Sequence, residues 1–192
     1  MLARTLIFIG MLGAAPILLA QATSTASRTL DIQIGGGYSY VTPDSEPHDY
    51  TGGAAYANVN FRAHYGIEGE FHFAKDSAGT GQYEKTYEIG PRYFRTYGRF
   101  IPYVKVMFGR GVYNFVAPCT PGYDKNCSAT GPIVYVTVAN LAYNLIAGGG
   151  GVDYALLKHV NVRADWEYQR WLNFEGSSLS PNVFTVGAAY HF

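Results

Sequence analysis

Two pairs of acidic residues stand at alternate positions, a spacing that could support acid–base chemistry. Glu68 and Glu70 form the first pair, with His72 two residues further on, and Asp165 and Glu167 form the second. Two carboxyl groups that flank a sugar linkage can hydrolyse a glycosidic bond. Residues spaced by two, however, share one face of a β-strand. Because arginines occur on other predicted strands, the sequence favours interior ion pairs over a glycosidase, with His72 hydrogen-bonded among them.

The histidines offer no nucleophile–base pair for a hydrolase. The stretch KHVNVRADWE at 158–167 resembles the lipid A deacylases in outline, but those enzymes carry a His-x-Ser pair, whereas Asn161 stands two residues after His159. Neither glycine run, IGGGY or AGGGGVDY, is followed by the Lys-Ser or Lys-Thr of a phosphate-binding loop. The sequence therefore predicts no catalytic residue and no cofactor.

Both cysteines, Cys119 and Cys127, lie in one irregular stretch rich in proline and glycine. Two cysteines without histidine partners nearby make a poor zinc site, so no metal site is predicted. An exported protein meets an oxidising compartment, where such cysteines pair. We therefore predict a disulfide between Cys119 and Cys127 within a surface loop.

Composition narrows the class of protein. The chain has 192 residues, of which 48% are hydrophobic, 16% aromatic and only 15% charged. Few charges combined with many tyrosines and glycines suit a β-rich protein with one face in an apolar medium. The formal net charge is zero, so no electrostatic footprint for a phosphate backbone exists and no nucleic-acid partner is predicted.

The first segment has the pattern of a secretory signal peptide. Arg4 precedes an apolar run at 6–20, and a small-residue Ala-Gln-Ala site follows at 20–22. The run is short for a membrane anchor helix and is interrupted by glycine and proline. We therefore predict three segments: a signal peptide over 1–22, a short lead over 23–28 and one domain over 29–192.

Apolar and polar residues alternate along the rest of the chain, with turn residues between the runs. Strands of roughly nine to eleven residues can cross a bilayer when tilted. We expect eight strands of about this kind, over 29–41, 53–64, 67–75, 83–94, 100–113, 142–154, 160–171 and 183–192.

The polar faces of these strands carry charges of both signs. In a soluble sandwich the apolar faces would meet in a core. In a small closed barrel the apolar faces meet lipid instead, and the charges converge inside, where a mixed set can pair. The predicted lumen charge network comprises Arg62, Glu68, Glu70, Glu88, Arg92, Lys105, Arg163, Asp165 and Glu167.

The gaps between predicted strands alternate in length. This asymmetry is typical of an outer-membrane barrel, with long loops outside and both termini on the periplasmic side. The long gaps are 42–52, 75–82, 114–138 and 170–181, and the short ones are 64–66, 95–99 and 155–159.

The late strands also resemble a known family. FIPYVKVMFGRG and GGGGVDYALLKHVNVRADWEYQRW are similar to late strands of the outer membrane protein A-like and opacity-protein-like barrels. The last strand, VFTVGAAYHF, resembles the signal read by the bacterial barrel-assembly machinery, which implies that role for Phe184, Val186, Tyr190 and Phe192. The resemblance covers 29–192. The chain ends at the barrel, unlike outer membrane protein A itself, so we do not expect cell-wall tethering.

These observations together predict an all-β fold, an eight-stranded antiparallel transmembrane β-barrel in the outer membrane of a diderm bacterium. The expected partners are outer-membrane lipid and lipopolysaccharide, the barrel-assembly machinery during biogenesis, and an extracellular ligand bound by loops. The expected function is a scaffold whose surface loops serve adhesion or ligand recognition, and not an enzyme. A narrow small-solute channel is one alternative, although side chains just fill eight strands. A lipid-modifying enzyme is the other.

Overall fold

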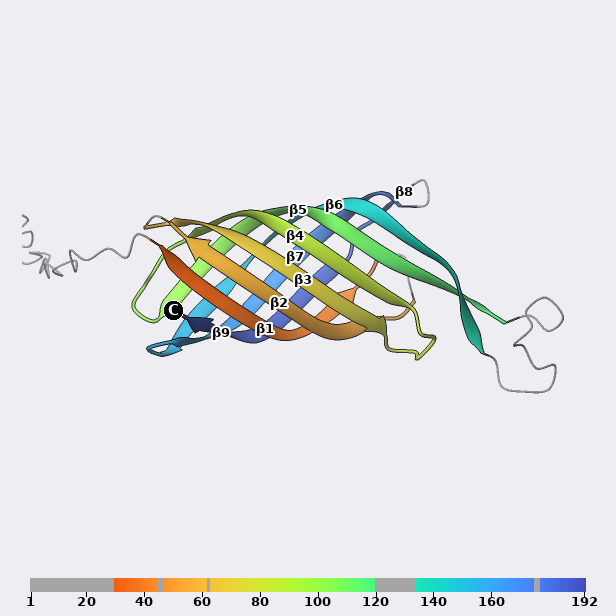
Figure 1. Cartoon of the computed structure of the whole chain (residues 1–192), viewed down its shortest axis with the longest axis horizontal. Coiled ribbons are helices and arrows are strands. Elements are labelled where there is room, and N and C mark those ends of the chain that lie inside the picture. Colours follow the sequence, from red (N-terminus) through yellow and green to blue (C-terminus); the bar gives the residue numbers. More distant parts are fainter. Residues whose placement is uncertain (1–29, 45–46, 62, 120–133, 175–176) are drawn as a thin grey trace, which may run out of the picture.

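The computed structural model describes residues 30–44, 47–61, 63–119, 134–174 and 177–192. These residues form β-strands that wrap into a closed cylinder (Figure 1). Within the described ranges, no helix has the length and apolar character needed to cross a membrane. In chain order the strands are β1 (Asp31–Thr42), β2 (Tyr50–Asn60), β3 (Tyr65–Asp76), β4 (Tyr83–Phe94), β5 (Phe100–Pro118), β6 (Tyr135–Leu157), β7 (Val160–Phe174), β8 (Ser177–Leu179) and β9 (Asn182–His191).

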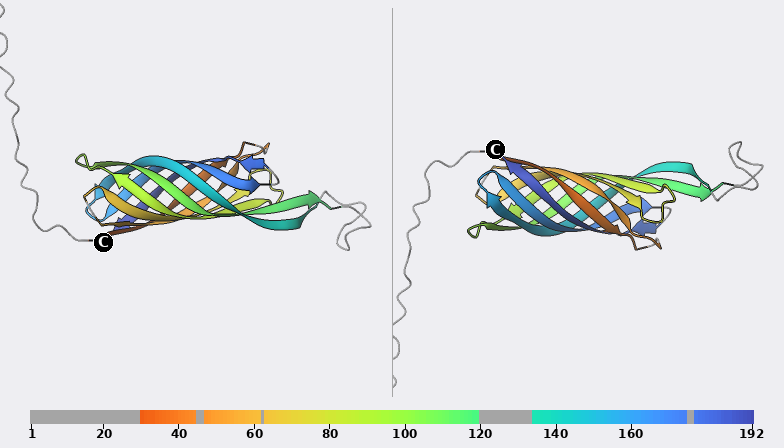
Figure 2. Two further views of the ribbon diagram at one scale, coloured as in Figure 1. Left: turned by 90° about the horizontal axis from the view of Figure 1, so that it is seen from above. Right: turned by 90° about the horizontal axis from the view of Figure 1, so that it is seen from below.

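Eight of these strands form an antiparallel ring. Consecutive strands pair from β1 to β7, and β9 closes the ring by pairing with both β1 and β7. The short β8 pairs with β7 beyond the end of β9. Because every ring strand has a partner on both sides, backbone N–H and C=O groups meet the bilayer without an open edge. The predicted eight-stranded antiparallel barrel is confirmed (Figure 2).

Side chains alternate between the lumen and the outer wall. In β5, Tyr103, Lys105 and Met107 are buried inside the barrel, whereas Val104 and Val106 are 59% and 52% exposed on the wall. A protein folded in water would place these two sets the other way round. The exposed apolar wall is the surface that lipid tails cover.

Aromatic side chains gather towards the ends of this wall. At the end that holds the C-terminus, the rings of Phe100 and Tyr154 lie 5.0 Å apart, as do those of Tyr190 and Phe192. Further along β7, the Trp166 indole is 45% exposed. Such rings suit the two interfaces of a bilayer, where their apolar bodies and polar tips are both satisfied.

The two ends of the barrel carry different connections. Phe192 N–H donates to the carbonyl of Ile32, so the start of β1 and the C-terminus share one end, which we call the inner end (Figure 1). At the inner end the chain passes from β2 to β3, from β4 to β5 through 95–99, and from β6 to β7 through 158–159. At the outer end it passes from β1 to β2, from β3 to β4 through 77–82, from β5 to β6, and from β7 by way of β8 to β9.

Several predicted strand boundaries are wrong. We expected an irregular stretch over 114–138, but β5 continues to Pro118 and β6 begins at Tyr135. Prolines and glycines in the middle of this stretch obscured the β-forming run VYVTVA at 134–139. The expected loop at 170–181 contains the end of β7 and β8. There Asn173 adopts a φ of 58°, which asparagine tolerates, at a shift in strand register.

Candidate functional site

The inner part of the lumen holds an ion-pair cluster built on two arginines. Arg163 Nε lies 2.7 Å from Asp153 Oδ1, and its Nη1 lies 3.1 Å from Glu68 Oε2. Arg92 contacts the same two carboxylates, with 3.4 Å between its Nη1 and Glu68 Oε2. Because these four residues come from β3, β4, β6 and β7, charge-assisted hydrogen bonds tie opposite walls of the barrel together.

Two tyrosine rings cover the guanidinium groups of this cluster. Arg92 Cζ lies 3.8 Å from the centroid of the Tyr103 ring, and Arg163 Cζ lies 3.9 Å from that of Tyr56. Arginine stacks well on aromatic faces. The rings also exclude water, which strengthens the ion pairs beneath them.

Lys105 lies at the centre of the lumen among four carboxylates. Its Nζ is 2.9 Å from Asp165 Oδ2 and 3.1 Å from Glu167 Oε2. The same atom lies 3.2 Å from Glu68 Oε1 and contacts Glu70 Oε2. An ammonium group has three N–H donors, so it cannot donate a separate hydrogen bond to each of the four carboxylates.

The structure places eight residues of the predicted charge network inside the lumen with buried side chains, namely Glu68, Glu70, Glu88, Arg92, Lys105, Arg163, Asp165 and Glu167. Arg62 lies outside the described residues. Asp153, which shares the inward face of β6 with Gly151, joins this network without having been predicted as a member. Glycine carries no polarity signal, so this face of the strand was hard to recognise.

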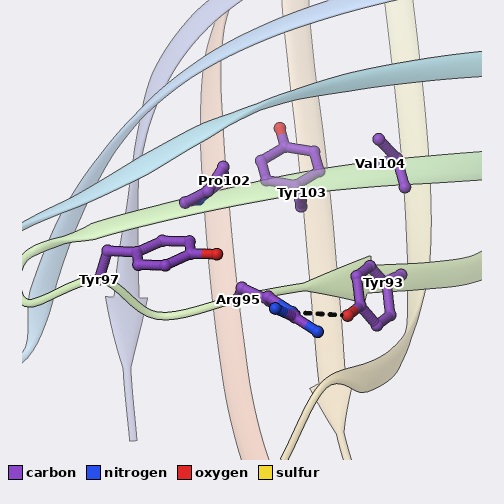
Figure 3. A pocket seen from close by; sticks show the side chains of 6 residues that line it. All are labelled: Tyr93, Arg95, Tyr97, Pro102, Tyr103 and Val104. Carbon is purple, nitrogen blue, oxygen red and sulfur yellow. Dashed lines mark hydrogen bonds between the residues drawn. The ribbon is translucent and has the colours of Figure 1, made fainter. Parts of the chain in front are cut away.

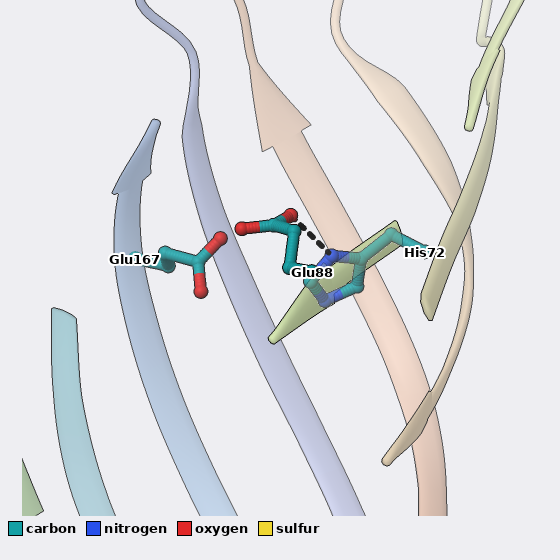
Figure 4. Close-up of side chains that lie close together, drawn as sticks. All are labelled: His72, Glu88 and Glu167. Atoms are coloured by element: carbon teal, nitrogen blue, oxygen red, sulfur yellow. Dashed lines mark ion pairs between the residues drawn. The ribbon is translucent and has the colours of Figure 1, made fainter. Parts of the chain in front are cut away.

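His72 lies among carboxylates and a hydroxyl group towards the outer side of Lys105. Its Nε2 is 3.0 Å from Glu70 Oε1, and its Nδ1 is 3.2 Å from Thr86 Oγ1. Figure 4 shows Glu88 between His72 and Glu167, with 3.8 Å from His72 Nδ1 to Glu88 Oε1. Two sets of ligand atoms, each within 4.8 Å, could hold a metal: His72, Glu88 and Glu167, and Glu70, Asp165 and Glu167.

The outer part of the lumen is filled by an apolar plug. Tyr50 and Tyr113 share a hydrogen bond of 2.6 Å between their hydroxyl groups, and the Trp171 ring packs edge-on to Tyr113. Gly111 allows this packing, because a Cβ there would collide with the Trp171 ring. The buried members of the apolar plug are Val41, Tyr50, Ala74, Met107, Tyr113, Leu145, Ala147, Trp171, Phe174, Leu179 and Val183.

Strands β5 and β6 extend past their neighbours at the outer end. The last β4–β5 pair is Tyr83 with Asn114, and the last β6–β7 pair is Leu145 with Trp171. Beyond these pairs the two strands continue to pair with each other. We call residues 115–118 and 135–144 the outer hairpin, which projects from the barrel in Figure 1.

A hollow of about 210 Å³ lies in the wall near the inner end (Figure 3). Arg95 Nε donates a hydrogen bond of 2.8 Å to the hydroxyl of Tyr93 at its edge, and Tyr97 and Pro102 also line it. A cation beside tyrosines is typical of the bilayer interface, so this hollow has the character of a lipid-facing rim and not of a catalytic cleft.

The remaining predicted residues that the structure describes lie outside the lumen. Phe184, Val186, Tyr190 and Phe192 are exposed on the outer wall. Cys119 N–H donates to the Val134 carbonyl at 2.7 Å, while Cys127 lies outside the described residues, so their disulfide stays a prediction. The predicted signal peptide and lead also lie outside them. His159 Nδ1 lies 2.9 Å from the carbonyl oxygen of His191, which fits a structural role.

Comparisons with solved structures give the same fold. Ail, the attachment invasion locus protein of Yersinia pestis, was solved with the heparin analogue sucrose octasulfate; it is 19% identical over 85% of this chain and 97% of its own, with a TM-score of 0.52. OprG from Pseudomonas aeruginosa is 14% identical, and the match covers 84% of this chain and 95% of OprG with a TM-score of 0.54. Neisserial surface protein A is 12% identical, and the match covers 85% of this chain and 97% of that protein, also with a TM-score of 0.54. No curated protein matches the sequence significantly.

A sequence-family comparison identifies the class of barrel. Residues 11–192 match the family described as outer membrane protein beta-barrel domain. Its relatives by structure are barrels of the outer membrane protein A-like and opacity-like type. Localisation to the outer membrane of a Gram-negative bacterium follows from this match. The chain belongs to the outer membrane protein beta-barrel family.

Proposed function

We propose that this barrel is a membrane-embedded scaffold that presents the outer hairpin to an extracellular partner. The observation that carries the proposal is the continuation of β5 and β6 beyond the last pairs that they make with β4 and β7. A rigid barrel that holds a projecting ribbon in one orientation lowers the entropy lost when a partner binds. Binding residues are often found on such projections from a stable scaffold.

The surface of the hairpin indicates the chemistry of the partner. Tyr135, Val138 and Leu141 are 43%, 61% and 44% exposed. Residues 112–119 and 134–145 include no charged side chain. An apolar surface with amide and hydroxyl groups suits a neutral protein or glycan surface. Although Ail was solved with a polyanion, a polyanionic ligand would require cations that this ribbon lacks.

The interior gives less support to the alternative functions. Lys105, Met107 and Trp171 occupy successive levels of the lumen and are almost inaccessible to water. Even a narrow small-solute channel would need an open path past these side chains. Hydrolase chemistry would need a nucleophile and a histidine that a substrate can reach. The Thr86 hydroxyl beside His72 is buried in the lumen, and the contact from His159 goes to a backbone carbonyl.

The test replaces residues 115–139 with Asn-Gly, which joins the paired residues Asn114 and Asn140 by a two-residue turn and removes the projecting ribbon. We expect attachment of barrel-expressing cells to immobilised matrix proteins or neutral glycans to fall at least tenfold. The matched control replaces the 77–82 turn, also at the outer end, with an equally short one. Heat-modifiable gel mobility would verify that both barrels fold.

Two outcomes would reject the proposal. Attachment that survives loss of the hairpin would remove this ribbon from recognition. Preferential binding to heparin over neutral glycans would contradict the chemistry assigned to it. Repeating the assay with purified barrel in vesicles without lipopolysaccharide separates direct binding from contacts with neighbouring sugars. The substitution Leu141→Ser provides a smaller change within the same ribbon.

We also propose that the predicted Cys119–Cys127 disulfide holds the tip of the hairpin. Closing a short loop restricts the unfolded chain, so the bond would stabilise the tip. Mass spectrometry of peptides prepared without reductant should find these two cysteines linked in protein taken from the membrane. Recovery of two free thiols from such protein would contradict the pairing.

A further inference from the structure

The lumen contains more acidic groups than its own cations can neutralise. Among the described buried residues there are seven carboxylates, three permanent cations and one histidine. Uncompensated charges in a water-poor interior are costly, so such a surplus favours either bound protons or a bound cation. The carboxylates are Glu68, Glu70, Glu84, Glu88, Asp153, Asp165 and Glu167, and the other groups are Arg92, Lys105, Arg163 and His72.

The surplus is greatest on the outer side of Lys105. That ammonium group already contacts four carboxylates, and the arginines lie with Glu68 and Asp153 on the inner side. Glu88 has no arginine or lysine within ion-pair distance among the described residues. Glu88 Oε2 is buried and has no hydrogen-bond partner among the described residues.

The orientation of His72 leaves one ring nitrogen for a ligand. Nε2 lies 3.0 Å from Glu70 Oε1, outside hydrogen-bond alignment but close enough that the negative charge of the carboxylate favours the proton on this nitrogen. Nδ1 then carries the lone pair and faces Thr86 and Glu88. A carboxylate behind a histidine is the usual arrangement that orients a metal-ligating imidazole.

The side-chain amide of Gln169 holds the carboxylates of Glu88 and Glu167 together. Gln169 Nε2 donates to Glu88 Oε1 at 2.8 Å and to Glu167 Oε1 at 2.9 Å. The amide orientation is set by Trp171 Nε1, which donates to Gln169 Oε1 at 3.0 Å. In Figure 4 the Glu88 and Glu167 carboxylates face each other beside the His72 ring.

We propose that His72, Glu88 and Glu167 form a buried site for a divalent transition-metal cation such as Zn²⁺, with Glu70 as a positioning residue. Zinc bonds of about 2.0–2.2 Å place tetrahedral ligands about 3.4 Å apart. The 3.8 Å between His72 Nδ1 and Glu88 Oε1 is close to this separation. Ca²⁺ and Mg²⁺ bind oxygen ligands almost exclusively, so the imidazole selects against them. This site is independent of the function proposed for the outer hairpin.

The position of the site determines how the cation exchanges. The apolar plug lies on its outer side and the arginine cluster on its inner side, so a hydrated ion has no open route to it. We therefore expect capture while the barrel folds and slow release afterwards. Zinc added during refolding should be retained, whereas zinc added to the folded barrel should enter slowly.

The experiment uses the untagged mature chain refolded in detergent with Zn²⁺, with Ca²⁺ and Mg²⁺ in parallel. After gel filtration in the presence of a chelator, mass spectrometry of the metal should find about one zinc per barrel, and no retained calcium or magnesium. His72→Gln and Glu88→Gln should each lower retained zinc at least tenfold. His159→Gln, which removes a histidine outside the lumen, should leave it unchanged.

Absence of retained zinc in the wild-type barrel would overturn the proposal in favour of a proton shared between Glu88 and Glu167. Equal zinc in the wild type and in both lumen variants would overturn it in favour of surface binding. Should a variant fail to show heat-modifiable mobility, X-ray absorption of the zinc-loaded wild type decides. One imidazole nitrogen with carboxylate oxygens supports the site, and a shell of water oxygens rejects it.

Discussion

The inner and outer parts of the lumen have similar burial but are stabilised by different contacts. Strand β7 crosses both: Arg163, Asp165 and Glu167 enter the charge network, whereas Trp171 and Phe174 enter the apolar plug. A buried ion pair stabilises the fold only while both charged groups are present, because removing one of them leaves an uncompensated charge. Apolar packing depends on volume, and a small loss is partly absorbed by relaxation. One scaffold thus carries two regions with different tolerance to substitution.

The largest expected effect comes from removing the central cation. Lys105→Met keeps the length of the side chain but leaves the four neighbouring carboxylates without their ammonium partner. Breaking a buried ion pair costs about 3–5 kcal/mol. Urea unfolding of the barrel in lipid vesicles should show a loss of free energy of unfolding of this size.

The matched control for this change is Lys85→Met, a partly exposed lysine on β4 whose Nζ lies 5.4 Å from the centroid of the Phe73 ring. Surface substitutions of this kind change stability by about 0.5 kcal/mol or less. Equal losses for the two variants would show that the charge network does not carry the stability assigned to it. Lys105→Arg retains the charge and tests whether geometry matters as well.

The apolar plug is tested by adding volume to it. Gly111→Ala places a methyl group against the Trp171 ring, and overpacking a core costs about 1–3 kcal/mol. Gly148→Ala is the control, because nothing lies within 4 Å of the added Cβ. If both variants unfold at the same urea concentration, Trp171 is free to move and the plug is not tightly packed.

A hydrogen bond within the plug gives a smaller effect. Tyr50→Phe removes the hydroxyl that lies 2.6 Å from the Tyr113 hydroxyl, and a typical buried hydrogen bond contributes about 1 kcal/mol. Tyr87→Phe on the lipid-facing wall, where Tyr87 is 53% exposed, is the control. If Tyr50→Phe lowered the free energy of unfolding as much as Lys105→Met, the outer part of the lumen would also depend on paired polar groups.

The sequence predicts the barrel better than it predicts the arrangement within it. Alternation in strands such as β5 and β7 separates inward from outward residues, because one face must meet lipid and the other cannot. Distances between strands depend on register and tilt, which a single sequence does not encode locally. The nearness of His72 to Glu167, across the lumen from β3 to β7, is therefore absent from the sequence analysis. The outer hairpin was missed since proline and glycine in its tip outweighed the β-branched residues beside it.

The smallest expected effect lies outside both parts of the lumen, where the last residue of β3 contacts the turn at 77–82. Burial raises the pKa of Asp76, but hydrogen bonds from the Thr80 hydroxyl and from the N–H groups of Ala78 and Thr80 together lower it below its ordinary value of 3.8. A lowered pKa in the folded state stabilises the fold above the unfolded-state pKa, and this stabilisation disappears as the pH falls through the folded-state pKa. Asp76→Asn should therefore cost a little stability near neutral pH and nothing at strongly acid pH, as measured by unfolding at several pH values. Because Asp76 is partly exposed at the end of the barrel, water screens its contacts, and the loss should be smaller than for any substitution in the lumen. A loss that persists unchanged below the folded-state pKa would mean that the turn depends on the second acceptor oxygen, which the amide lacks, and not on the charge.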